Sequence, residues 1–82
     1  MNVTWNSTSW LLNQALDNRW VLVGIVQGVS HPDLYRIGIQ DTSTSARYSA
    51  VFDAGKRIFL DDLPITIDAT QILNTIRTLV NK

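Results

Sequence analysis

The chain has 82 residues, of which 45% are hydrophobic and 17% charged, and its formal net charge at pH 7 is zero. This length has room for one domain spanning residues 1–82, and the low charge with many large apolar groups argues against disorder. The neutral balance also argues against a dedicated nucleic-acid binder or a polybasic membrane anchor, because both need an excess of Lys and Arg.

The first element that the pattern predicts is a short helix over residues 8–17. The polar residues 6–9 offer several N-caps, and Asp17 stands near the expected end. Apolar side chains follow on one side at helical spacing, at Leu11, Leu12, Ala15 and Leu16.

The next element is a strand from Trp20 to Gln27, because this stretch is rich in β-branched residues. Both of its faces are apolar, with Val21, Val23 and Ile25 on one and Trp20, Leu22 and Val26 on the other. A strand that is apolar on both faces is usually covered on both. We therefore expect the second face to meet either a helix or another chain.

Three further strands are expected, over residues 34–41, 46–53 and 57–61. Alternation places one set of apolar side chains on a common inward face, namely Tyr35, Ile37, Ile39, Tyr48, Ala50, Phe52, Ile58 and Leu60. Between the last two strands, Gly55 is available for a turn with a positive φ. Pro64 cannot donate to a ladder, so residues 65–67 form an edge segment at best.

The final element is an amphipathic helix over residues 68–82. Asp68 is its expected N-cap, where its carboxylate also suits the helix dipole. The apolar stripe consists of Ala69, Ile72, Leu73, Ile76, Leu79 and Val80. The predicted fold is therefore α+β, with an antiparallel four-stranded meander sheet, a short N-terminal helix and a C-terminal amphipathic helix in the order α-β-β-β-β-α.

Two sets of residues suggest chemistry, and each has a simpler structural interpretation. His31 and Asp33 flank Pro32 and could form an acid–base pair, but a solvated turn is the better explanation for them. The aspartates of the 61–62 pair and Asp68 could bind a hard cation, but neighbouring strand residues point to opposite faces. We favour turn, edge and capping roles for all of them.

The rest of the sequence adds no catalytic or cofactor signature. Residues 53–56 resemble a phosphate loop only superficially, because they lack its glycine spacing and its following helix. The chain has no cysteine, which excludes disulfides and cysteine-ligated metal. Residues 1–8 lack the features of a signal peptide, and no apolar run is long enough to span a bilayer. We expect a cytoplasmic, non-enzymatic protein without cofactor, metal or small-molecule substrate.

The surplus of apolar surface favours a protein–protein interaction domain, because an uncovered aromatic and aliphatic patch usually marks an interface. The partner would be a second copy, giving a homodimer, or a larger assembly that the protein inhibits or adapts, as small phage or mobile-element proteins do. The alternative is weak nucleic-acid binding by a sheet face that carries arginines and an aromatic ring. The predicted partner-binding residues are Trp20, Leu22, Val26, Arg36, Arg47, Arg57 and Phe59.

Overall fold

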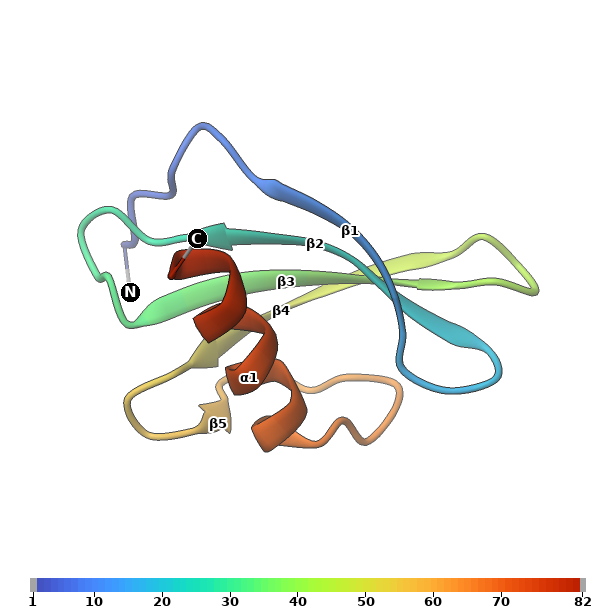
Figure 1. Ribbon diagram of the computed structural model, residues 1–82. Coiled ribbons are helices and arrows are strands. Elements are labelled where there is room, and N and C mark those ends of the chain that lie inside the picture. The colour runs from blue at the N-terminus through green and yellow to red at the C-terminus, as the bar shows by residue number, and fades with distance from the viewer. Residues whose placement is uncertain (1, 82) are drawn as a thin grey trace.

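A computed structural model describes residues 2–81 as one antiparallel sheet with one helix on one of its faces (Figure 1). The elements are β1 Trp10–Ala15, β2 Trp20–Gln27, β3 Leu34–Asp41, β4 Arg47–Asp53, β5 Ile58–Phe59 and α1 Ala69–Val80. The strands lie side by side in chain order, so the sheet is a five-stranded meander. The antiparallel meander order and the C-terminal helix agree with the prediction, although α1 spans Ala69–Val80 and the predicted helix end at residue 82 lies outside the described residues.

The predicted N-terminal helix is wrong, because Trp10–Ala15 forms strand β1 and pairs with β2. Side chains along β1 alternate between half-buried and exposed, which is the two-residue period of a strand. Leu11 and Leu12 point to opposite faces of the sheet. Two adjacent leucines are compatible with one face of a helix, but here they belong to the two faces of a strand. Within residues 2–81 the fold is therefore mostly β with one helix, and the sheet has five strands rather than four.

The residues that the helix prediction used as its end instead close the β1–β2 hairpin. The Asp17 carboxylate accepts hydrogen bonds from the backbone N–H of Arg19 at 2.8 Å and of Trp20 at 2.8 Å. Leu16 then donates its backbone N–H to the Trp20 carbonyl. Aspartate side chains commonly stabilise turns in this way, so Asp17 sets the reversal that brings β1 alongside β2.

The core lies between the sheet and α1. The Asp68 side chain caps this helix by accepting the Thr70 backbone N–H at 2.8 Å, as the sequence predicts. The inward stripe of α1 buries Ile72, Leu73 and Ile76. Their partners in the core are Trp20, Leu22, Ile25, Tyr35, Ile37, Ile39 and Phe52.

Strand β2 departs from the predicted alternation. Its pairing with β3 shifts register between Leu22 and Gly24, which places one extra residue, Val23, on the β2 side. A bulge of this kind reverses the faces of the residues that follow it. Ile25 therefore joins Leu22 in the core, and Val26 lies on the opposite face, whereas the sequence placed Leu22 and Val26 together.

The end of the sheet also differs from expectation. Strand β5 has only two residues, and Phe59 packs on Phe52 with ring centroids 4.8 Å apart, while Ile58 is exposed. The expected faces of the 57–61 strand are thus reversed. The positive φ of this turn falls on Arg57, at 60°, and not on Gly55. Residues 65–67 form no strand.

Replacing Arg57 with glycine should stabilise the protein by about 1 kcal/mol. A left-handed backbone strains a residue that has a Cβ, and this gain exceeds the entropy that glycine loses on folding. The matched control is Lys56→Gly in the same turn, where φ is not positive and glycine should not stabilise. Urea unfolding of both variants tests this, and equal changes in the free energy of unfolding would contradict it.

Candidate functional site

The sheet has one face that α1 does not cover. Cross-strand partners show which residues share it: Val26 is paired with Arg36, and Arg36 with Val51, in one row across three strands. The next rows contain Gly24, Gly38 and Ser49, then Val21, Gln40 and Arg47. We call this surface the open face and define it by the residues of these three rows together with Val23 and Leu11.

The open face is apolar but not flat. Its valines are partly exposed, and Leu11 at its β1 edge is 85% exposed. A hollow of about 450 Å³ lies over the centre, where Gly24 and Gly38 face each other across β2 and β3. Neither glycine has a side chain to fill the space between the flanking valines, so the two together form the floor of the hollow.

A second hollow of about 610 Å³ adjoins the first, and Arg36 and Ser49 line both. Its other walls come from the N-terminal segment, including Trp5, and from Val51 and Asp61 near β4. The backbone bridge between Trp5 and Gly28 holds that segment beside β2. Arg36 and Ser49 are therefore within reach of a ligand in either hollow.

Two arginines supply the charge of the open face. Arg47 Nε donates to Gln40 Oε1 at 3.0 Å, and Arg36 donates through a terminal nitrogen to Ser49 Oγ at 3.4 Å. Both acceptors are neutral, and within residues 2–81 the only ion pair within 4 Å involves Arg19. Each guanidinium is thus oriented by a neutral neighbour and keeps further N–H donors for a ligand.

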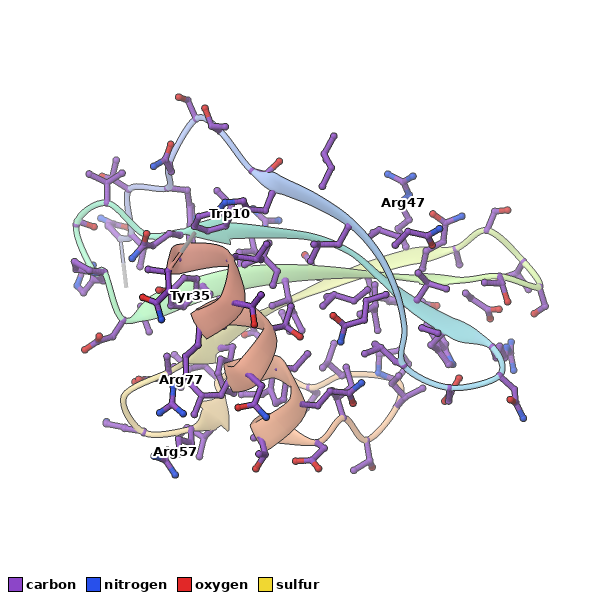
Figure 2. The ribbon with its side chains drawn as sticks, viewed as in Figure 1. Trp10, Tyr35, Arg47, Arg57 and Arg77 are labelled. Atoms are coloured by element: carbon purple, nitrogen blue, oxygen red, sulfur yellow. The ribbon has the colours of Figure 1, made fainter. Side chains whose placement is uncertain are left out.

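The structure brings together only some of the predicted partner-binding residues. Val26, Arg36 and Arg47 share the open face, whereas Trp20 and Leu22 lie in the core beneath α1. The other two predicted residues lie elsewhere. Phe59 packs on Phe52, and Arg57 lies in the turn before β5, far from Arg47 in Figure 2.

Sequence reasoning missed the residues that shape the hollows. Gly24 and Gly38 stand in separate strand segments of the sequence and carry no functional prediction there, yet the β2–β3 register sets them opposite each other. The available signal was a glycine in each of two neighbouring strands. That the two glycines share one floor can be recognised only when the β2–β3 register is known, and the bulge at Val23 changes that register.

Three of the candidate acid–base and cation residues, His31, Asp61 and Asp68, make local hydrogen bonds. His31 Nδ1 lies 2.9 Å from Ser30 Oγ at the surface, and the Asp61 carboxylate accepts the Val51 backbone N–H at 3.0 Å. Asp53 accepts the N–H of residues 55 and 56, which makes the 53–56 segment a turn. No group of three or more His, Cys, Asp or Glu side chains within residues 2–81 is arranged to hold a metal ion.

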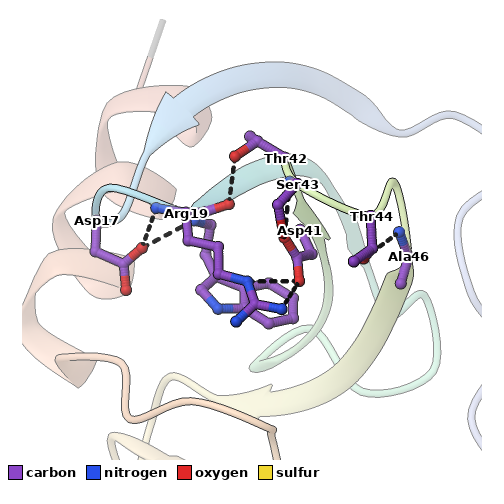
Figure 3. A network of polar contacts seen from close by, with 8 residues as sticks. Asp17, Arg19, Asp41, Thr42, Ser43, Thr44 and Ala46 are labelled. Atoms are coloured by element: carbon purple, nitrogen blue, oxygen red, sulfur yellow. Dashed lines mark hydrogen bonds and ion pairs between the residues drawn. The ribbon is translucent and has the colours of Figure 1, made fainter.

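The most strongly perturbed carboxyl group belongs to a structural network at one end of the sheet (Figure 3). Asp41 is 2% exposed, and its carboxylate accepts from Arg19 Nε at 2.7 Å and from Ser43 Oγ at 2.7 Å. The hydrogen bond from Arg19, together with those from Ser43, holds the pKa of Asp41 far below its usual range despite burial, which opposes the shift. Thr42 donates to the Arg19 carbonyl, so the network joins the β1–β2 and β3–β4 turns.

The helix α1 of the described part of the chain is too short and too polar to span a membrane. Comparison of the chain with known protein families, curated proteins and solved structures finds no match. Its own surface is therefore the basis for assigning a role.

Protonating Asp41 should destabilise the fold. Its pKa is lower in the folded than in the unfolded chain, so its stabilisation is complete above the usual aspartate pKa of about 4 and is lost as the pH falls below it. Urea unfolding between about pH 6 and about pH 2 should show a steeper fall for the wild type than for Asp41→Asn. The control is Asp62→Asn, an exposed aspartate, which should keep the wild-type slope. Equal slopes for wild type and Asp41→Asn would show that this carboxylate is not coupled to folding.

Proposed function

We propose that the chain is a non-enzymatic protein-binding domain whose contact surface is the open face. The main support for this proposal is the hollow over Gly24 and Gly38, which lies on the sheet face that has no helix and is bordered by partly exposed valines. Apolar surface with a polar rim is typical of a protein interface, and Arg36 and Arg47 supply that rim. The cysteine-free composition suits a cytoplasmic setting for this interaction.

A different protein fits this surface better than a second copy of the chain. Two copies joined open face to open face would bring four arginines, Arg36 and Arg47 of each copy, into one interface. Like charges at a desolvated interface oppose association. The homodimer expected from the apolar surplus is therefore the weaker form of this proposal.

Nucleic-acid binding has less support than protein binding. Binding of single strands combines positive charge with aromatic rings on which bases stack. The ring that the sequence offered for this purpose, Phe59, packs on Phe52 in the core layer. Two other rings, Trp5 and Tyr48, line the hollows, but the surface between the two arginines is made of glycines, valines and Ser49 rather than a row of stacking rings.

Filling the central hollow should remove partner binding and leave the fold intact. A Cβ on Gly38 would meet Val23 Cγ2 at 3.7 Å, which is ordinary contact, and valine suits a strand. We therefore expect Gly38→Val to melt at or above the wild-type temperature. Affinity capture from an extract of the source cells, quantified by mass spectrometry, should recover a partner with the wild type and lose it, about tenfold or more, with Gly38→Val.

The matched control adds the same bulk to the other side of the molecule. Asn74 is exposed on α1, so Asn74→Val should retain the partner that Gly38→Val loses. A partner recovered equally by all three proteins would place the contact outside the open face and contradict the proposal.

A further inference from the structure

We propose that the open face binds an extended acidic segment of another protein, in which two carboxylate residues flank an aliphatic residue with the spacing acidic–x–aliphatic–x–acidic. This inference rests on the proposed function and specifies its partner. It follows from the positions of Arg36 and Arg47 relative to the hollow between them.

The charge of the partner follows from the unpaired arginines. In the described part of the chain, Arg36 and Arg47 each have one side-chain hydrogen bond to a neutral acceptor, and neither has a carboxylate within 4 Å. Asp61 borders the same hollow as Arg36, but its carboxylate accepts a backbone N–H from Val51. A guanidinium binds carboxylates through paired N–H donors, so carboxylates are the ligand that both arginines fit.

The spacing follows from the strand register. Arg36 lies on β3, and Arg47 is the cross-strand partner of Gln40, four residues further along β3. Four strand residues span about 13 Å at about 3.3 Å per residue. An extended segment lying along β3 covers this span with its residues i and i+4, whose side chains point the same way. These two positions are therefore the acidic ones.

The middle position follows from the floor of the hollow. Gly38 lies halfway between positions 36 and 40, beside Gly24, and Val23 and Val26 form the wall. Residue i+2 of the segment points toward the sheet at this place. An aliphatic side chain there would fill the space that the two glycines leave. Its apolar surface would be buried, which favours binding. Valine, leucine and isoleucine are the residues that fit it.

The chain itself does not carry such a segment. All seven of its acidic residues are aspartates, and no two of them are four residues apart. A second copy therefore cannot supply the carboxylates at the required spacing, and the partner is a different chain.

The experiment screens the full-length protein against a library of random displayed peptides. The selected peptides are synthesised with a fluorescent label, and Kd is measured by polarisation for the wild type, Arg36→Gln, Arg47→Gln and Gly38→Val. We expect the acidic–x–aliphatic–x–acidic pattern to be enriched. Each arginine variant should weaken binding about tenfold, because each loses a hydrogen-bonded charge pair. Gly38→Val should abolish binding.

Arg77→Gln is the matched charge control, because it removes one positive charge from exposed α1 instead of from the open face. It should leave Kd unchanged. Raising the salt concentration should weaken peptide binding by the wild type more than by the double variant Arg36→Gln/Arg47→Gln, because exposed charge pairs are screened.

The outcomes separate the partner chemistry from the proposed function. Peptides that lose binding to Gly38→Val but lack carboxylates, or bind both arginine variants normally, would overturn the acidic partner and leave the open face as the contact. Peptides that bind Gly38→Val as well as the wild type would overturn both. A library that yields no binder would overturn the acidic segment. A single-stranded thymidine oligonucleotide is the last probe. If it binds more tightly than any peptide and needs both arginines, the acidic segment is also overturned, because the open face would then bind nucleic acid.

Discussion

One helix has to cover a sheet of five strands, and it can cover only one face. The stripe of α1 centred on Ile72 and Ile76 packs on that face, where the sheet supplies large side chains such as Leu22 and Phe52. Burying these side chains is the main source of stability for a chain of this size. The opposite face has no second layer within residues 2–81, so its apolar groups stay at the surface. The location of a binding surface follows from this asymmetry.

The same asymmetry explains why the bulge in β2 matters. Without an extra residue at Val23, strict alternation would direct Ile25 away from α1 and Val26 toward it. The bulge keeps the larger side chain in the core and leaves the smaller valine on the open face, next to Arg36. It also sets Gly24 against Gly38, so one local irregularity completes the core and shapes the hollow.

The buried carboxylate of Asp41 and the arginines of the open face lie in different parts of the sheet. Asp41 is buried at one end of the sheet and satisfied by Arg19 and Ser43, so this carboxylate is unavailable to the open face. The network ties two hairpin turns together, which fixes the ends of β2 and β3 that carry the open face. A binding surface on hydrogen-bonded strands loses less backbone freedom on binding than a flexible loop would.

The sequence by itself determined the elements whose hydrophobic pattern fits only one type of secondary structure. The stripe and the Asp68 cap specify α1, and clean alternation specifies β3 and β4, because each pattern allows one periodicity only. Only the tertiary structure decided the rest. Strand β1 is apolar on both faces near Leu11 and Leu12, so its period was ambiguous until pairing with β2 selected the strand. Of the predicted site, Val26, Arg36 and Arg47 share a face, whereas Trp20 is in the core. That division depends on register and on which face α1 covers, and neither is encoded in any one segment.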